Sequence, residues 1–290
     1  MKKKLICLLL LAAMAASLCS CAVIDNLAVL QKSTDGMTYK EVDGEIHITG
    51  YSDKTTVTEL TIPDEIDGKP VTVIADFGVS NADSLKVITL GKNVREIGTW
   101  GLTNNQHLAA FAVAEGNTAF KAEDGVLFSA DGKTLYNYPC GRGIEFDRFG
   151  MAPTDEEGNS VYVDYEIPDG VETVRDKAFY KCYYVNVTRF PDTISVIGEK
   201  AFHKCTSLKD FTMPAAIERI GKDAFSYNEN LTHLEIGENI KEIGEYAFFY
   251  CKNLKSLTIR AKESDLTLGK KWQPTDKGKI LEDLTVTFAE

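Results

Sequence analysis

The 290-residue sequence has few of the residues and motifs from which most enzyme active sites are built. Its four histidines stand singly, and none belongs to an HExxH pair, a metal-ligand spacing or a GxSxG serine motif. No glycine-rich phosphate loop follows an expected strand. The 43 acidic residues make chance carboxylate pairs expected, so no pair stands out. We therefore expect no catalytic residue, no cofactor and no metal, and an enzyme with an unrecognised carboxylate site is the least favoured function.

Clustered positive charge is also missing. The formal net charge is -11, and no run of three basic residues occurs after Lys4. Proteins that follow nucleic acid need grouped lysine and arginine to displace the counterions of the phosphates. The sequence therefore excludes nucleic acid as a partner, and it offers no attraction to anionic lipid headgroups.

The longest apolar run lies at the N-terminus, from Leu5 to Leu18, after three lysines. It is shorter than the roughly 20 residues that span a bilayer, and it has the order of a secretory signal. Leu18-Cys19-Ser20-Cys21 resembles a bacterial lipobox, in which the chain is cut before the last cysteine and its thiol is acylated. Residues 1–21 are thus predicted as a lipoprotein signal peptide with Cys21 as the lipidation site. An ordinary signal peptide and an uncleaved anchor are the alternatives.

This prediction places the protein outside the cytoplasm, anchored by lipid to the cell envelope and facing the surface or the periplasm. Removal of residues 1–20 takes away three lysines and no acidic residue, so the formal charge of -11 becomes -14. Any contact with the membrane must then come through the lipid on Cys21.

One unit of sequence recurs at a fixed period of 23 residues. An alanine and phenylalanine pair marks four copies, at Ala178-Phe179, Ala201-Phe202, Ala224-Phe225 and Ala247-Phe248. Two looser copies precede them, where Gly78-Val79 and Gly101-Leu102 take the place of the pair. A repeat of this length cannot bury its apolar face alone and must stack on its neighbours. We therefore expect a solenoid.

Each repeat carries the pattern LxxLxL, as in Leu231, Leu234 and Ile236. Its final alternation predicts a strand with one buried face. Ala201, Phe202 and Cys205 have helical spacing, which predicts a short helical turn in each coil. The expected fold class is therefore α+β or mostly β.

These columns resemble the BspA-type leucine-rich repeat family of bacterial surface proteins, whose repeat reads roughly LxxLxIPxxVxxIGxxAFxxCxxL. Lys204 to Phe225 matches this pattern almost column by column, and the resemblance extends from about Met37 to Ile259. The chain departs from it where Arg175 replaces glycine and Asn228 replaces cysteine. The resemblance implies a leucine-rich repeat array of 23-residue coils with hairpin insertions and caps. It also implies a binding role, because some members adhere to host extracellular-matrix proteins or to other cells.

The ends of the array are expected to differ from its middle. Residues 22–36 are polar and small, which predicts a tether, and residues 37–290 are expected to form the repeat domain. Within it, residues 37–62 are predicted as an N-terminal cap, because Asp43-Gly44 suits a tight turn between the strands of a hairpin. Residues 261–290 are predicted as the C-terminal cap.

Trp272 lies in this C-terminal segment and is expected to cover the end of the core. Between the caps, an insertion at residues 120–162 separates the early coils from the regular repeats at 163–260. Asp124-Gly125 and Asp131-Gly132 predict a second hairpin there, and the chain from Cys140 onward predicts an exposed loop. The acidic residues of this loop lack the alternating spacing of a calcium site.

Seven cysteines are present, of which Cys7 and Cys19 leave with the signal. Three others share one repeat column with Asn228: Cys182, Cys205 and Cys251. A column that accepts asparagine is a stacked structural position. We therefore expect buried reduced thiols, with a bridge between Cys182 and Cys205 as the alternative.

The residues between the inward-facing ones of each LxxLxL strand form outward columns, which repeat at roughly 4.8 Å. The first two coils and the start of the third contribute mainly small or apolar members: Val87, Thr89, Ala110, Ala112 and Val187. Over the last four coils the columns are mostly short or polar and contain no lysine, and they form the candidate ligand face: Arg189, Asp210, Thr212, His233, Glu235, Ser256 and Thr258.

We expect a protein ligand to dock on this face, in a surface-exposed lipoprotein that acts by binding, for example in adhesion to host or neighbouring cells. The loop from Gly141 to Tyr162 is the competing site, and a solvated face without a ligand is the alternative for any single residue. A glycan-binding surface protein is the second function considered. It would favour exposed aromatic residues on the outward columns, which have almost none.

Overall fold

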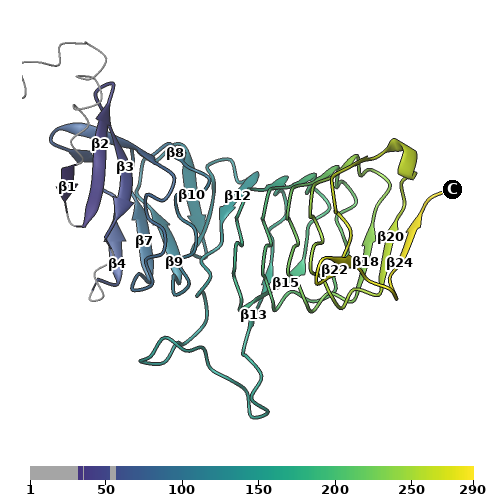
Figure 1. Cartoon of the computed structure of the whole chain (residues 1–290). Coiled ribbons are helices and arrows are strands. Elements are labelled where there is room, and N and C mark those ends of the chain that lie inside the picture. Colours follow the sequence, from purple (N-terminus) through teal and green to yellow (C-terminus); the bar gives the residue numbers. More distant parts are fainter. Residues whose placement is uncertain (1–31, 35, 53–56) are drawn as a thin grey trace, which may run out of the picture.

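The chain forms an elongated solenoid in the computed structural model, which describes residues 32–34, 36–52 and 57–290 (Figure 1). Its coils follow one another along a single axis from the N-terminal strands to the C-terminus. The mostly β solenoid that the 23-residue period predicts is confirmed. The lipobox, Cys21 and the tether up to residue 31 lie outside the described residues.

One side of the solenoid is a row of parallel strands formed by the LxxLxL segments, which we call the ladder wall. Pairing advances by one repeat from coil to coil, so that Leu234 lies beside Leu257. The wall consists of three groups of strands: β4 (Glu59–Thr61), β7 (Val87–Leu90) and β9 (Ala110–Val113), then β13 (Val163–Glu166) and β15 (Val185–Arg189), then β18 (His233–Ile236), β20 (Ser256–Ile259) and β24 (Thr285–Phe288).

A second wall is made of short parallel strands. Most of them end at the apolar residue that precedes the repeated glycine, as β17 ends at Ile220 before Gly221. Gly221 permits their close stacking, because a Cβ added there would lie 2.6 Å from the backbone nitrogen of Glu199. The strands of this wall in the regular repeats are β14 (Thr173–Val174), β16 (Val196–Ile197), β17 (Arg219–Ile220), β19 (Glu242–Ile243) and β21 (Thr267–Leu268).

The predicted N-terminal hairpin is confirmed. Its turn has the positive φ angles of a tight hairpin turn, 51° at Asp43 and 82° at Gly44. One further strand, Lys32–Thr34, lies inside the segment predicted as tether and pairs with the hairpin, so the cap begins before residue 37. The sheet at this end contains β1 (Lys32–Thr34), β2 (Met37–Val42), β3 (Glu45–Tyr51), β5 (Glu65–Ile66), β6 (Lys69–Ile74) and β8 (Glu96–Ile97).

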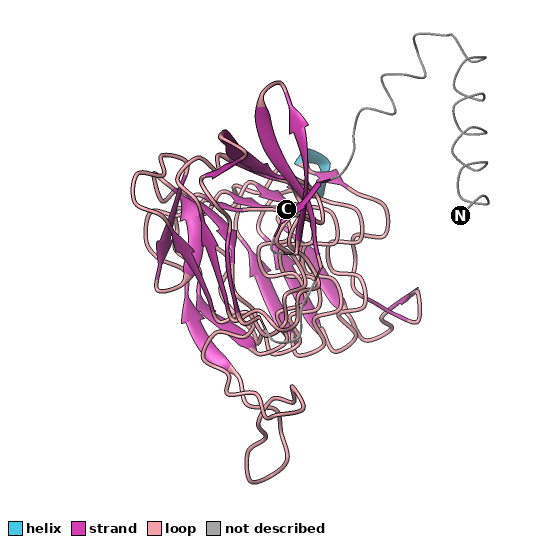
Figure 2. Cartoon of the chain, turned by 90° about the vertical axis from the view of Figure 1, so that its left-hand side faces the viewer, coloured by secondary structure: helices cyan, strands magenta, loops and turns pink. Residues whose placement is uncertain are grey.

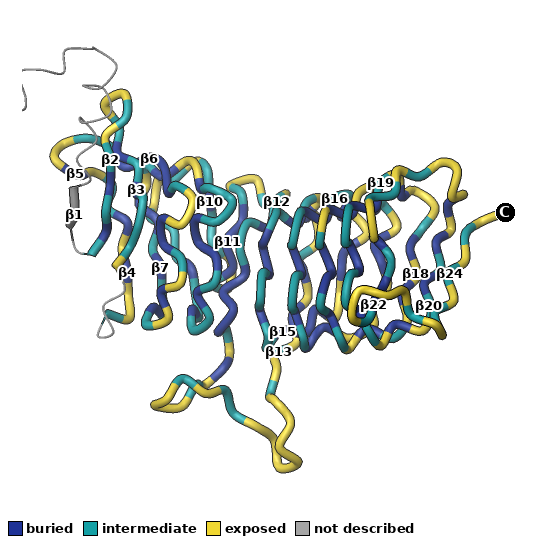
Figure 3. Tube along the Cα trace, viewed as in Figure 1, coloured by how far each residue is buried: buried dark blue, intermediate teal, exposed yellow. Residues whose placement is uncertain are grey.

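The insertion begins with the predicted second hairpin, which is extended to three antiparallel strands: β10 (Phe120–Glu123), β11 (Val126–Ser129) and β12 (Thr134–Asn137). β12 then pairs in parallel with β14, so the insertion returns the chain to the second wall. The loop that follows projects away from the solenoid and is largely exposed, as predicted (Figures 1, 2 and 3). Phe149 and Met151 in this loop are 72% and 64% exposed.

The helical turn expected at Ala201, Phe202 and Cys205 is wrong, because Ala201 and Phe202 lie in a non-helical turn and Cys205 in irregular chain. Lys200 and Lys204 have positive φ angles of 54° and 59°, which a right-handed helix does not allow. The Phe202 amide donates to the carbonyl of Ala224 in the next coil over 2.8 Å instead of to its own coil. Among the described residues, the helical segment is the short 3-10 turn η1 (Glu263–Asp265).

Stacked phenylalanines run through the centre of the regular repeats. The ring centroids of Phe179 and Phe202 lie 4.8 Å apart, those of Phe202 and Phe225 5.3 Å, and those of Phe225 and Phe248 5.7 Å. All four side chains are fully buried. The column that the repeat predicts as core is therefore confirmed.

The C-terminal segment closes the end of this core as predicted. Trp272 is 7% exposed, and its carbonyl accepts a hydrogen bond from the amide of Phe248. A small hairpin of β22 (Thr275–Asp276) and β23 (Lys279–Ile280) precedes the last ladder strand.

The cysteine prediction is correct for two residues and wrong for the third. Cys205 and Cys251 are buried free thiols. Cys182, however, forms a disulfide with Cys140, at the point where the exposed loop leaves the solenoid. Cys140 lies outside the repeat, so the repeat columns carry no signal for this pairing.

Candidate functional site

Six of the seven residues of the candidate ligand face lie together on the ladder wall. Strand pairing places Ser256 beside His233 and Thr258 beside Glu235, and an isolated bridge joins Thr212 to Glu235. A shallow depression of about 370 Å³ opens on this surface. It is lined by Phe211 and Leu234 together with the six predicted residues: Asp210, Thr212, His233, Glu235, Ser256 and Thr258.

Arg189 does not line this depression. It ends β15 and forms an ion pair with Asp169. A register shift between β13 and β15 precedes it, so that Glu166 faces Arg189 while Tyr165 faces Val187. Arg189 therefore lies at the margin of the candidate face.

The same register shift corrects the expected position of Val187. The repeat places this residue outward, but it is 1% exposed, and the neighbouring Thr188 is exposed instead. The shift puts the apolar side chain in the core and leaves Thr188 at the surface, where its hydroxyl donates to the carbonyl of Tyr165.

The charged groups of the face are already paired within the protein. The Asp210 carboxylate accepts hydrogen bonds from the backbone amides of Thr232 and His233, over 2.6 and 3.1 Å. Burial acts to raise the pKa of Asp210, but the hydrogen bonds from Thr232 and His233 outweigh it and hold the pKa below its usual value. Glu235 is paired with Arg260. These contacts fix the acidic side chains in place.

The face continues onto the C-terminal cap, which the sequence prediction did not include. β24 pairs with β20, so that Thr285 lies beside Ser256 and Thr287 beside Thr258. The hydroxyls of Thr287 and Thr258 are 3.3 Å apart. The sequence signal for this extension is the alternation of Leu284, Val286 and Phe288, which leaves the two threonines between them pointing outward.

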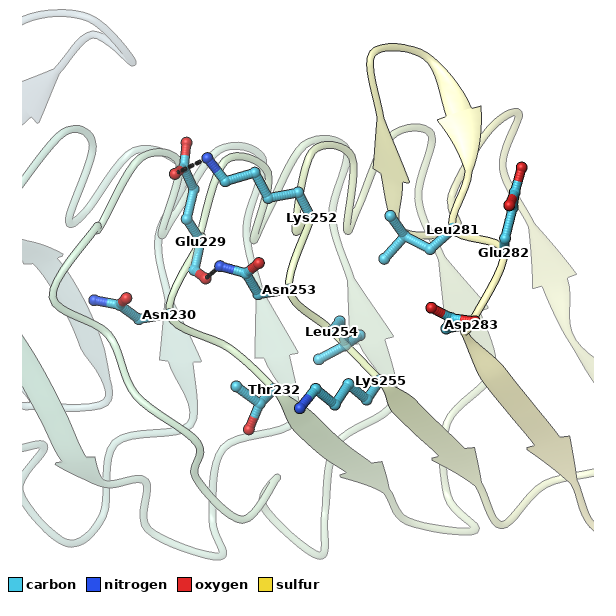
Figure 4. Close-up of a pocket in the computed structure, with 10 residues that line it drawn as sticks. All are labelled: Glu229, Asn230, Thr232, Lys252, Asn253, Leu254, Lys255, Leu281, Glu282 and Asp283. Carbon is cyan, nitrogen blue, oxygen red and sulfur yellow. Dashed lines mark hydrogen bonds and ion pairs between the residues drawn. The ribbon is translucent and has the colours of Figure 1, made fainter.

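Two further cavities lie along the edge where the turns lead into the ladder strands. The larger has a volume of about 670 Å³ and lies between the last regular coils and the C-terminal cap (Figure 4). Leu254 and Leu281 line it, and the ion pair of Lys252 with Glu229 lies at its margin (Figure 4). The second cavity, of about 500 Å³, lies at the base of the exposed loop and shares Asn230 with the first.

Within the described part of the chain, no three histidine, cysteine, aspartate or glutamate residues are grouped as metal ligands. In the loop, the Asp155 carboxylate accepts hydrogen bonds from the amides of Glu157 and Asn159 and so closes a local turn. No helix of the described residues is long and apolar enough to cross a membrane.

The chain matches the family model of the BspA type leucine rich repeat region in six copies, over residues 45–123 and 159–268. This match covers more than half of the sequence. The protein therefore belongs to the BspA-type leucine-rich repeat family, as the repeat pattern predicts.

Several solved structures resemble this solenoid. A leucine rich cell surface protein from Faecalibacterium prausnitzii A2-165 is 17% identical with a TM-score of 0.52, covering 90% of this chain and 95% of that chain. The pneumococcal vaccine antigen PcpA is 17% identical with a TM-score of 0.48, covering 90% and 87%. The leucine rich repeat protein of T. pallidum is 21% identical with a TM-score of 0.40, covering 82% and 86%. A comparison with curated proteins gives no match.

Proposed function

We propose that this protein is a surface-exposed bacterial lipoprotein that binds a protein ligand through the ladder wall of its last coils. The observation that carries the proposal is the grouping of Asp210, Thr212, His233, Glu235, Ser256 and Thr258 around one depression. Four of these side chains stand on the paired strands β18 and β20, and Thr212 is joined to them by an isolated bridge. The carboxylates of Asp210 and Glu235 are held by neighbours. A face ordered before binding loses little conformational entropy when a partner docks.

The partner that best fits this face is a protein that brings hydrogen-bond donors and a positive surface. The mature chain carries a formal charge of -14 once residues 1–20 are removed. Opposite charge on the partner would speed association, and this effect would weaken with salt. Anchoring through Cys21 would present the solenoid at the cell envelope, where adhesion to host or neighbouring cells is the use that we favour.

The test compares two threonines at the same position of a ladder strand. Thr258→Arg places a bulky side chain in the depression, and Thr89→Arg makes the same change on β7, outside it. Both variants and the parent, as the mature chain, are tested for binding to immobilised extracellular-matrix proteins and to whole cells. We expect Thr258→Arg to weaken binding at least tenfold and Thr89→Arg to leave it unchanged.

A deletion of residues 154–160 provides the competing arm, because it shortens the exposed loop. Loss of binding in the deletion, with full binding by Thr258→Arg, would contradict the proposal and move the site to the loop.

A further inference from the structure

The cavity at the base of the exposed loop has a lining unlike the rest of the surface. Three tyrosines, two asparagines, several hydroxyls and one lysine form it, and the aromatic members are Tyr162, Tyr183 and Tyr184. No carboxylate lines it, although the chain has 43 acidic residues. Its volume of about 500 Å³ is within the range of small-molecule sites.

This combination of groups suits a polyhydroxylated ligand without charge. Phenol rings offer flat apolar faces for the C–H face of a sugar ring, and their hydroxyls remain able to hydrogen-bond. Amide and hydroxyl side chains both donate and accept, as sugar hydroxyls do. The one cation, Lys209, lies 4.3 Å from the centroid of the Tyr162 ring and bonds to its hydroxyl, so it is already engaged within the protein.

The tyrosines are held in place before any ligand arrives. The rings of Tyr183 and Tyr184 lie 6.3 Å apart at 76°, which forms a corner. Tyr184 also contacts the edge of Phe146, and the backbone carbonyl of Tyr183 accepts a hydrogen bond from Ser207. Burial raises the pKa of Tyr183 further above neutral pH, so its hydroxyl is a donor there. Rigid aromatic side chains give contact area at low entropic cost.

The asparagines supply hydrogen-bonding groups at the same site. The Asn230 amide nitrogen donates to the carbonyl of Thr206 over 2.6 Å, and that of Asn159 donates to Asp155 over 3.0 Å. These bonds fix both amides and leave their side-chain oxygens without a hydrogen bond among the described residues. An amide oxygen in this position can accept a hydrogen bond from a sugar hydroxyl.

The site extends along the edge of the solenoid. Asn230 also lines the larger cavity, where Asn253 follows it one coil later and makes the same bond, to the carbonyl of Glu229 (Figure 4). Coils repeat at roughly 4.8 Å, which is about the length of one pyranose residue. An extended chain of sugars could therefore meet one coil per residue.

We propose that this cleft, defined by Tyr162, Tyr183, Tyr184, Asn159 and Asn230, binds a neutral linear oligosaccharide. The site is separate from the candidate ligand face and adds a second kind of ligand to the protein. A glycan site on the outward columns would need exposed aromatic residues there. The aromatic residues of this cleft lie instead at the edge of the solenoid, beside the loop.

The test uses two asparagines that make the same bond at different places. Asn230→Lys alters the cleft, and Asn239→Lys is the matched control outside it. The exposed Asn239 amide also donates to a carbonyl of the preceding coil, that of Ala215, over 2.9 Å. Tyr162→Ala removes one ring of the cleft. Affinity of the mature chain for neutral hexasaccharides of glucose, mannose and N-acetylglucosamine is measured by calorimetry, with heparin as the anionic comparison.

We expect binding of at least one neutral hexasaccharide, a loss of at least tenfold in Asn230→Lys and Tyr162→Ala, and no change in Asn239→Lys. Circular dichroism and the urea midpoint verify that each variant is folded. Binding of heparin alone, the absence of neutral hexasaccharide binding, or equal binding by all variants would overturn the proposal. Thr258→Arg should retain sugar binding, so a failure here is distinct from a failure of the proposed protein ligand.

Discussion

The side-chain amide of Asn228 donates a hydrogen bond to the carbonyl of Phe202 in the preceding coil, over 2.8 Å. Cys205 and Cys251 make the equivalent bond with their thiols, to Phe179 at 3.0 Å and to Phe225 at 3.1 Å. At these three positions the column carries a small donor that reaches back by one coil, whereas Cys182 in the same column is bonded to Cys140. Asparagine and cysteine both supply such a donor, which explains why they alternate in one position of the repeat.

The first prediction follows from this shared bond. Asn228→Ala removes the donor from buried carbonyls, which should lower the free energy of unfolding by about 1–3 kcal/mol. Asn228→Cys should match the wild type or exceed it, because the thiol restores the donor and removes the Asn228 Oδ1 atom, which is buried without a hydrogen-bond partner among the described residues. Urea unfolding of both variants measures this. Equal destabilisation by alanine and cysteine would count against it.

The second prediction concerns the disulfide between Cys140 and Cys182, which closes a segment with a sequence separation of 42. Cys140→Ser should lower the free energy of unfolding by about 2–4 kcal/mol, chiefly because the unfolded chain gains freedom. A reductant should destabilise the wild type but not this variant. Alkylation of the denatured chain from residue 22 onward should label two thiols, Cys205 and Cys251, and labelling of four would show that the bridge is absent.

The third prediction tests the phenylalanine stack. Phe202 is fully buried between Phe179 and Phe225, so Phe202→Ala should cost about 3–5 kcal/mol of stability. Phe77 is 58% exposed and serves as the control, with a much smaller expected loss for Phe77→Ala. An unchanged urea midpoint in Phe202→Ala would contradict the buried position of this ring.

Much of this architecture could be predicted because each coil repeats the same environment. The column of Phe202 and the outward pair His233 and Glu235 follow from period and alternation alone. The Asp43-Gly44 turn follows from its demand for positive φ angles. In each case a local chemical preference and the repeat point to the same structure.

The features that could not be predicted depend on contacts outside the repeat. Cys140 meets Cys182 only because the insertion returns to the second wall, and Val187 is buried only because a register shift intervenes. The tyrosine cleft joins Tyr162 of the insertion to Tyr183 and Tyr184 of the next coil. Such neighbours are set by how the insertion leaves and rejoins the array, and no periodic pattern records that path.

The fourth prediction concerns the lipid anchor. Metabolic labelling with a fatty-acid analogue should tag the wild-type protein in a bacterial host and should not tag Cys21→Ala. The thiol of Cys21 is the expected acceptor, because it ends the lipobox-like segment Leu18-Cys19-Ser20-Cys21. Cys19→Ala is the control and should remain labelled. Equal labelling of Cys21→Ala would exclude this lipidation site.

The last prediction links stability to pH through His203. This side chain stacks on Tyr180 at 5.1 Å, and its Nδ1 atom lies 2.7 Å from the Ser226 hydroxyl. Burial lowers its pKa to about 4, helped by the positive charges of Lys204, Lys200 and Lys181. The folded state therefore holds His203 neutral at pH values where the unfolded chain, with an ordinary histidine pKa of about 6.5, already binds a proton.

Protonation of His203 in the unfolded chain thus favours unfolding as the pH falls below about 6.5. The resulting loss of folding stability is complete below the folded pKa of about 4. After allowance for screening of this partly exposed ring, we expect a loss of about 1–2 kcal/mol from this one group. His203→Phe keeps an aromatic ring in the stack but cannot bind the proton. Urea unfolding at intervals from pH 7 to pH 4 should give a smaller decline for His203→Phe than for the wild type, since both proteins share the same carboxylates. Parallel curves for the two proteins would mean that His203 does not contribute to the pH dependence.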